Sequence, residues 1–309
     1  MDPLTASTLR GTWATLLLPI DEREAIDFDR LDAQLAHLLA SGVAGVYTNG
    51  TAGEFLAQSE DEFLEVSRRV AAACTAAGVP FQVGATHLSP QTTLARIRAT
   101  RPLAPGAYQV VLPDWVAPRF EEAVAFLQRV AGVAEGVGLV LYHPPFVRKP
   151  LGVEGLARLA AEVPQLIGVK VMDGPAEWYG AVRRHLPRLS VFVPGHHIVT
   201  GLLQGAQGSY SNVVSLSPRG AVALERLTAE DPLLALDVQR RLNDFLQEAV
   251  APHAARGHAG PALDKFLAVV GGWADVGTRL RWPYQGIAEA EAMAWRAHVR
   301  TLVPELFPT

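Results

Sequence analysis

The 309-residue sequence predicts a (β/α)8 barrel with a C-terminal helical extension. Two observations carry this prediction. Eight short, nearly continuous apolar runs alternate with amphipathic stretches over the first two thirds of the chain, and only helical patterns follow. Such runs are typical of parallel strands covered on both faces. Eight of them with helical crossovers favour a closed barrel over an open sheet.

The elements follow in order along the chain. We expect strands at 12–20, 43–48, 80–85, 107–113, 138–143, 166–172, 190–194 and 208–214. We expect helices at 27–41, 59–78, 89–102, 119–134, 152–163, 176–186 and 197–206. Ser59 followed by Glu62 is a capping box that starts the second helix. An open doubly wound sheet would carry a glycine-rich phosphate loop after its first strand, whereas strand one here ends in Leu-Pro-Ile-Asp-Glu.

The pattern changes near residue 218. Helices are expected at 218–228, 231–250, 260–271 and 285–302, with no further strand. We therefore divide the chain into a catalytic barrel, 1–217, and a helical extension, 218–309, that packs on it.

Composition narrows the class of protein. A hydrophobic share of 49% and a charged share of 19% indicate a sizeable core. The net charge of −4 gives no basic surface for nucleic acid or an anionic membrane. The single cysteine, Cys74, excludes an internal disulfide. The N-terminus lacks a signal-peptide pattern and no apolar run reaches membrane-spanning length, so we expect a cytoplasmic protein with no membrane partner.

Lys170 stands out among only three lysines, beside 24 arginines. It lies between two valines near the end of the sixth apolar run. Burial penalises the ammonium and lowers its pKa, and a free amine can attack a carbonyl to form a Schiff base. The run alone leaves a second interpretation open, an edge-strand lysine whose amine extends to water.

The barrel places further candidates beside Lys170. Active groups of such barrels lie at the C-terminal ends of the strands. Tyr142 is near the end of strand five, and the GTAGE loop, 50–54, follows strand two. Three candidates therefore converge on one mouth, which favours the catalytic interpretation of Lys170.

These motifs resemble the dihydrodipicolinate synthase/N-acetylneuraminate lyase family of class I aldolases, over nearly the whole chain. The resemblance implies that Lys170 forms a Schiff base with pyruvate or another 2-oxo acid. It further implies that Tyr142 shuttles the proton and that Thr51 supplies a hydroxyl to the relay. We predict no cofactor and no metal.

The GTAGE loop matches the family's binding site for the 2-oxo acid carboxylate. Backbone N–H groups in a small-residue turn form an anion nest, and Gly50 and Gly53 allow close approach. Ala52 departs from the family pattern, which has threonine there. The lost hydroxyl donor is worth ~1–2 kcal/mol, so we expect weaker carboxylate binding.

Two further departures concern the second substrate. Trp115 stands where family synthases place a second tyrosine, and indole cannot relay a proton. Val147 stands where the synthases have an arginine, with Arg148 displaced by one residue. The sequence leaves open whether Arg148 points inward. We assign Trp115 and His143 to substrate binding.

Strand seven ends in the pair His196-His197. Adjacent residues of a strand point to opposite faces, and no carboxylate partner is evident, so we expect His196 to bind substrate rather than a metal. Tyr210 on strand eight is expected to face the 2-oxo acid.

The sequence thus predicts a Schiff-base-forming lyase, aldolase or dehydratase acting on pyruvate or a 2-keto-3-deoxy acid. Two alternatives stay open: dihydrodipicolinate synthase proper, and a non-catalytic 2-oxo acid binding protein. A metal-dependent barrel hydrolase is more remote, because it would need carboxylates or histidines at several strand ends. By resemblance, we expect a homotetramer or homodimer.

Overall fold

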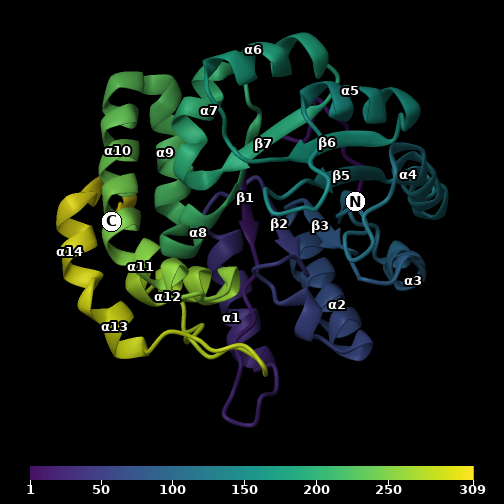
Figure 1. The fold of residues 1–309 in the computed structure, drawn as a ribbon. Coiled ribbons are helices and arrows are strands. Elements are labelled where there is room, and N and C mark those ends of the chain that lie inside the picture. The colour runs from purple at the N-terminus through teal and green to yellow at the C-terminus, as the bar shows by residue number, and fades with distance from the viewer. Residues whose placement is uncertain (309) are drawn as a thin grey trace.

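The computed structural model describes residues 1–308, and its centre is a closed barrel of eight parallel strands (Figure 1). The strands are β1 (Gly11–Thr15), β2 (Gly45–Thr48), β3 (Phe81–Gly84), β4 (Ala107–Val110), β5 (Gly138–Tyr142), β6 (Leu166–Lys170), β7 (Ser190–Pro194) and β8 (Gly208–Ser211). Each strand pairs with the next along the chain, and β8 pairs with β1. The predicted (β/α)8 class is confirmed.

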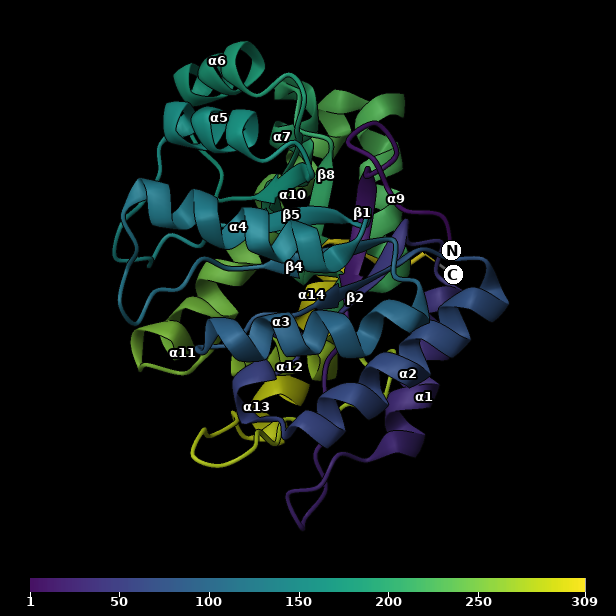
Figure 2. The same ribbon diagram turned by 90° about the vertical axis from the view of Figure 1, so that its right-hand side faces the viewer.

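Helices connect the strands and cover the outside of the barrel. They are α1 (Phe28–Leu39), α2 (Glu60–Ala77), α3 (Pro90–Thr100), α4 (Phe120–Ala134), α5 (Val153–Glu162), α6 (Ala176–His185), α7 (Ile198–Gln204) and α8 (Asn212–Leu216). Figure 2 shows α2, α3 and α4 side by side, and they contact one another in that order. The predicted capping box starts α2, with Ser59 accepting the Glu62 N–H and Glu62 accepting the Ser59 N–H.

The remaining helices lie along one side of the barrel (Figure 1). They are α9 (Pro218–Glu230), α10 (Pro232–Ala249), α11 (Ala251–Ala255), α12 (Gly260–Gly271), α13 (Glu289–Ala294) and α14 (Arg296–Leu302). Helix α9 contacts β1 and α7, so it completes the helical ring, and α12 contacts α8. We therefore propose that the barrel unit includes α9 and that the extension begins at α10 rather than at residue 218.

Most predicted elements are longer than the observed ones, and three of them show why. The first strand ends at Thr15 because the backbone of Leu17 bonds the side-chain amide of Gln34 on α1 instead of a neighbouring strand. The last strand ends at Ser211, whose hydroxyl caps α8. The helix predicted at 285–302 begins at Glu289 and is divided between α13 and α14 at Trp295.

The barrel interior is filled by large aromatic side chains. Trp13, Tyr47, Phe192 and Tyr210 belong to one buried cluster that is separate from the larger core between the barrel and the helices. Because side chains fill the interior, a site can form only at an end of the barrel, and in barrels of this class it forms at the carboxyl ends of the strands. Between Met1 and Pro308, no helix is long and apolar enough to cross a membrane.

Candidate active site

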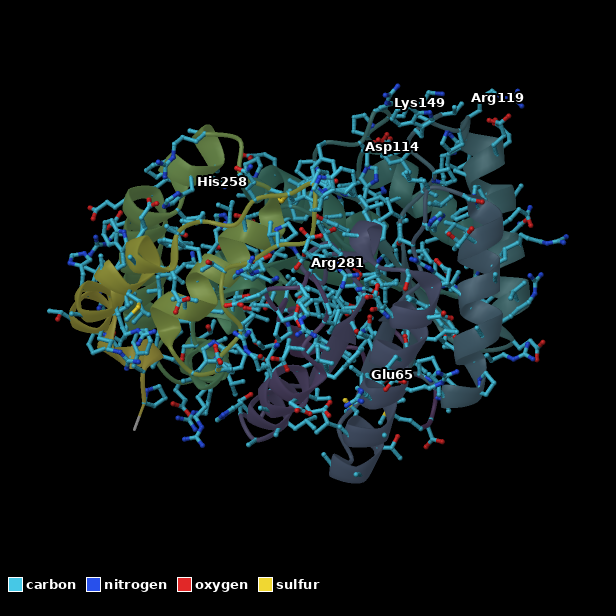
Figure 3. All side chains as sticks on the ribbon, turned by 90° about the horizontal axis from the view of Figure 1, so that it is seen from below. Glu65, Asp114, Arg119, Lys149, His258 and Arg281 are labelled. Carbon is cyan, nitrogen blue, oxygen red and sulfur yellow. The ribbon has the colours of Figure 1, made fainter. Side chains whose placement is uncertain are left out.

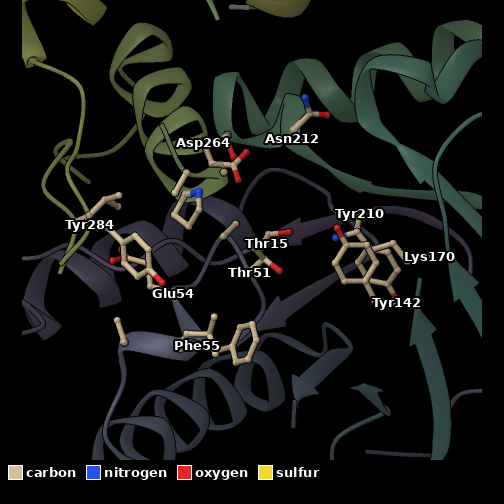
Figure 4. Close-up of a pocket in the computed structure, with 18 of the residues that line it drawn as sticks. Thr15, Thr51, Glu54, Phe55, Tyr142, Lys170, Tyr210, Asn212, Asp264 and Tyr284 are labelled. Atoms are coloured by element: carbon tan, nitrogen blue, oxygen red, sulfur yellow. The ribbon is translucent and has the colours of Figure 1, made fainter. Parts of the chain in front are cut away.

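A cavity of about 380 Å³ opens at the carboxyl ends of the strands (Figure 4). Lys170 and Tyr142 line it, together with Tyr210 and the loop after β2. Ala259, Gly260, Pro261 and Asp264, on and just before α12, line it too, so the C-terminal extension forms part of its wall. The other lining side chains include Thr15, Phe146, Ser211, Asn212, Ser215, Leu280 and Tyr284.

The pairing of β5 with β6 places Lys170 beside Tyr142. Each is the last residue of its strand, and the two are register partners across the β5–β6 pair. The Lys170 Nζ atom lies 4.2 Å from the centre of the Tyr142 ring. It also lies 5.5 Å from the Tyr210 ring centre and 6.0 Å from that of Tyr47. The amine therefore stands within a group of three tyrosine rings, which attract its protonated form.

Burial nevertheless dominates the ionisation of the amine. Desolvation lowers the pKa of Lys170 to about 8, against the opposing effect of the Asp264 carboxylate. The residue is only half-buried, because its end opens on the cavity. A sizeable fraction of the amine is thus free near neutral pH and accessible to a substrate, which is what nucleophilic attack on a ketone requires.

Tyr142 is suited to hold a proton. Burial, with a contribution from Asp264, raises the pKa of its phenol to about 12. At neutral pH the phenol is therefore protonated and can donate before it accepts. The expected relay partner, Thr51, lines the same cavity, but no hydrogen bond joins its hydroxyl to Tyr142 within residues 1–308. Its place in a relay stays a prediction.

The loop 50–54 presents its backbone to the cavity. Thr51 and Ala52 are lining residues, and no acceptor within residues 1–308 takes a hydrogen bond from the N–H groups of 50–53. Gly50 is required here, because a Cβ atom would lie 2.3 Å from the Tyr47 ring. Free N–H groups in a tight turn suit a carboxylate. The Ala52 methyl packs with Leu17 and Ala268, which leaves this position apolar.

A buried ion pair fixes this loop to the C-terminal extension. Glu54 Oε1 lies 2.6 Å from Lys265 Nζ, and the two side chains are 3% and 0% exposed. Lys265 also donates to the Arg279 carbonyl, and Glu54 accepts the Arg281 N–H. Lys265 follows Asp264 on α12, so the same contact that anchors the loop sets the position of Asp264 in the cavity wall.

Three residues considered for substrate binding lie outside this cavity. Trp115 is 75% exposed, and Arg148 stacks over its ring at 6.0 Å. Arg148 also donates its N–H to Asp114, which Figure 3 shows near Lys149 and Arg119 at one edge of the molecule. Buried His143 accepts the Leu151 N–H on Nε2 at 2.7 Å, and burial lowers its pKa. These contacts hold His143 and Arg148 in place, and the assignment of Trp115 and His143 to substrate binding stays a prediction.

The histidine pair differs from expectation in geometry. Strand β7 ends before it, and 195–197 form a 3-10 turn, so the rings of His196 and His197 lie 4.2 Å apart rather than on opposite faces. His197 also has a carboxylate partner, Asp173, at 3.2 Å. His196 bonds Asn212 Oδ1 at 3.1 Å, and burial lowers its pKa to about 4. Asn212, not His196, lines the cavity.

Tyr210 lines the cavity, and its hydroxyl donates to Gln82 at 2.7 Å; that Tyr210 faces the 2-oxo acid stays a prediction. Burial raises its pKa. In residues 1–308, no cluster of three or more His, Cys, Asp or Glu side chains is arranged to hold a metal.

The sequence interpretation missed Asp264. Burial raises the pKa of its carboxyl to about 6, and the Lys170 ammonium opposes this shift. The sequence did contain a sign of this buried carboxylate, because Asp264 and Lys265 are two charged residues within an otherwise apolar helical run. Charged residues inside such a run are seldom buried without a partner or a function.

Comparison with known proteins identifies the family of this chain. A model of the Dihydrodipicolinate synthetase family matches residues 8–300. A 4-hydroxy-tetrahydrodipicolinate synthase from Sorangium cellulosum (strain So ce56) is 30% identical over 224 residues, covering 71% of this chain and 73% of that protein. An N-acetylneuraminate lyase from Rhizobium meliloti (strain 1021) is 26% identical over 298 residues, covering 94% of each. A trans-O-hydroxybenzylidenepyruvate hydratase-aldolase from Sphingobium xenophagum is 25% identical over 169 residues, about half of each chain.

Solved structures share the fold. A prophage protein of the dihydrodipicolinic acid synthase family from Escherichia coli K12, in complex with pyruvate, superposes with a TM-score of 0.83. It is 18% identical, and the match covers 95% of this chain and 98% of that one.

Proposed function

Because the chain belongs to the dihydrodipicolinate synthetase family, we propose that it is a Schiff-base-forming lyase or aldolase acting on pyruvate or a 2-keto-3-deoxy acid through Lys170. The membership confirms the resemblance seen in the sequence. Relatives named as synthase, lyase and hydratase-aldolase support an enzyme of the class I pyruvate aldolase or lyase kind. The observation that carries the proposal is the Lys170 amine, with its lowered pKa, beside Tyr142 in the cavity.

The proposed chemistry begins with attack of the neutral Lys170 amine on the C2 ketone. Loss of water then gives an iminium ion, which accepts the electron pair when a bond at C3 breaks. The free N–H groups of residues 50–53 hold the C1 carboxylate. The Tyr142 phenol donates a proton to the departing oxygen of C2 and recovers one afterwards. A non-catalytic binding protein would need neither the amine nor the phenol.

Trapping the iminium ion tests the proposal. The full-length protein is incubated with each of a panel of 2-oxo acids and borohydride, and adducts are located by intact mass and peptide mapping. We expect one pyruvyl unit on Lys170. The other two lysines are internal controls, since Lys265 is enclosed in its ion pair and Lys149 is on the surface.

Two substitutions sharpen the result. Lys170→Ala and Lys170→Arg should both lose the adduct and turnover, since guanidinium stays protonated and is no nucleophile. An adduct on Lys149 or Lys265, or none with any 2-oxo acid, would remove Lys170 from the mechanism.

We further propose that the chain forms a homo-oligomer. The exposed side chains of Trp115, Val116 and Phe146, on the loops after β4 and β5, support this proposal, because exposed apolar groups of this size favour association. The cytoplasmic location stays a prediction from the sequence.

A further inference from the structure

The wall of the cavity that α12 contributes carries a carboxylate without a partner. Asp264 lies on the side of the cavity away from Lys170 and Tyr142 (Figure 4). Within residues 1–308 no hydrogen bond or ion pair reaches this carboxylate, and the neighbouring Lys265 contacts Glu54 instead. A carboxylate that is half-buried and unpaired costs stability, so its position calls for a ligand that pairs with it.

We propose that Asp264 is a specificity-determining residue that binds a protonated amine at the end of the substrate farthest from C2. This inference rests on the proposed function, and it describes the substrate as a 2-keto-3-deoxy acid whose far end carries an ammonium group. Lys170 and Asp264 line one cavity, so a single molecule can be held at C2 by Lys170 and extend toward α12. The length of the chain decides whether its amine reaches Asp264, and the experiment therefore varies that length.

The charges around the cavity favour a cation at this wall. Glu54 is neutralised by Lys265, and Lys170 is the only cation that lines the cavity within the described chain. When Lys170 becomes the iminium ion, the C1 carboxylate of the substrate balances its positive charge. Asp264 then remains a negative charge without a counter-ion, in a cavity where the surrounding protein strengthens the attraction between charges. An ammonium group on the substrate supplies this counter-ion.

Other groups at the far end of the substrate suit this wall less well. A carboxylate would meet Asp264 without a cation to bind it, and an α-amino acid end has the same defect, because a carboxylate adjoins its amine. A hydroxyl donates one hydrogen bond but leaves the charge of Asp264 unbalanced. The carboxyl pKa of about 6 keeps Asp264 ionised near pH 8. A primary alkyl ammonium, with a pKa of about 10, stays protonated there, so the two groups carry opposite charges.

The test condenses pyruvate with aldehydes that differ only at the far end. 3-Aminopropanal, 3-hydroxypropanal, butanal and succinic semialdehyde share one frame and end in ammonium, hydroxyl, methyl and carboxylate. Aminoacetaldehyde and propanal repeat the comparison of ammonium with methyl on a frame that is one carbon shorter. Product formation near pH 8 is followed by mass spectrometry, and kcat/KM is measured for each aldehyde.

We expect the better amino aldehyde to exceed its methyl analogue in kcat/KM by roughly 10–100-fold, as for a hydrogen bond to a charged group. Succinic semialdehyde should be the poorest of the series, because Asp264 repels its carboxylate. A site built to bind a polar group discriminates against the analogue that lacks it, so the methyl analogue should react slowly although it fits the same space.

Variants of Asp264 assign the preference to this side chain. Asp264→Asn should abolish the preference for ammonium over methyl, while borohydride trapping of pyruvate on Lys170 persists. The preference is a ratio measured on one preparation, so it does not depend on the folded fraction of the variant. Asp264→Glu keeps the charge and should recover part of the preference. Asp244→Asn, the same change at an exposed position on α10, is the matched control and should keep the wild-type ratio.

Several outcomes would overturn the inference. They are a wild-type ratio of ammonium to methyl near one at both lengths, a ratio that survives in Asp264→Asn, and a wild type that prefers the hydroxyl end to the ammonium end. A wild type that traps pyruvate yet condenses it with none of the aldehydes also overturns the inference, while the proposed Schiff-base chemistry stands. Absence of any wild-type pyruvate adduct overturns the proposed function itself.

Discussion

At the scale of single residues, the pKa of Lys170, on which its proposed reactivity depends, comes from two opposed effects. Enclosure by the barrel penalises the ammonium, while the Asp264 carboxylate and three tyrosine rings stabilise it. The balance leaves the pKa near 8, so the amine is charged in the resting enzyme but easily freed.

This balance predicts a pH dependence for imine formation. Below about pH 8 the amine is mostly protonated, so the rate should rise with pH and level off above that value. Cyanoborohydride trapping of pyruvate from pH 6 to 9, followed by intact mass, measures it. In Asp264→Asn the midpoint should move to lower pH, because the carboxylate no longer favours the ammonium. An unmoved midpoint would show that Asp264 and Lys170 do not interact.

Tyr142→Phe removes one hydroxyl and almost no volume. Turnover should fall about 10²–10⁴-fold, the range for a lost proton shuttle, and imine formation should slow as well. Steady-state kinetics and single-turnover trapping separate the two effects. Tyr108→Phe is a suitable control, because Tyr108 is buried and bonds Thr100 and the Ile97 carbonyl instead. Equal rates in wild type and Tyr142→Phe would exclude the phenol from the mechanism.

At the scale of elements, the loop 50–54 and α12 form one unit through the Glu54–Lys265 pair. The pair joins segments more than 200 residues apart and places Ala52 and Asp264 on the same cavity. Burial lowers the pKa of Lys265, but the adjacent carboxylate opposes that shift. One contact thus sets the positions of both the loop 50–54 and the Asp264 side of the cavity.

Lys265→Met should therefore destabilise the protein by about 3–5 kcal/mol, because it leaves the Glu54 carboxylate buried without its cation. Urea unfolding followed by circular dichroism measures the loss. The double variant with Glu54→Gln should recover much of it, since no uncompensated charge remains. Lys149→Met, on the surface, should change stability by less than ~0.5 kcal/mol. A Lys265→Met variant as stable as wild type would contradict the role of the pair.

The pattern of apolar runs was sufficient to predict the barrel, because short, nearly continuous apolar runs separated by amphipathic stretches are typical of parallel strands covered on both faces. The residues at which strands end could be predicted less well from the sequence. Leu17 is as apolar as a strand residue, and only its bonds to Gln34, a tertiary contact, exclude it from β1. Lys170 and Tyr142 were predictable from strand ends, whereas Asp264 lies on a helix whose approach to the mouth depends on packing between distant segments.

At the scale of the whole molecule, the barrel supplies Lys170, the proposed nucleophile, and the extension supplies the opposite wall of the cavity. Strands β5 and β6 place Tyr142 and Lys170, while α12 closes the other side with Asp264. The two parts form one continuous fold around the site. We therefore expect substrate choice to depend both on the proposed chemistry at C2 in the barrel and on the charge of the wall that α12 contributes.

This division predicts which second substrate is accepted. Synthase activity requires a cation to hold the carboxylate of aspartate semialdehyde, and bidentate arginine contacts of this kind are hard to replace. Val147 stands at the matching place, Arg148 stacks on Trp115 instead, and Asp264 would repel the carboxylate. Pyruvate with aspartate semialdehyde should therefore give little product, while a 2-keto-3-deoxy acid without a second carboxylate should be cleaved or dehydrated.

The decisive measurement runs the coupled synthase assay beside the keto-deoxy acid panel, on one preparation that traps pyruvate at Lys170. Condensation with a kcat/KM of roughly 10⁴ M⁻¹s⁻¹ or more would assign the protein as a synthase. That outcome would also require a cation from outside the described cavity wall, since Lys170 is committed to the imine.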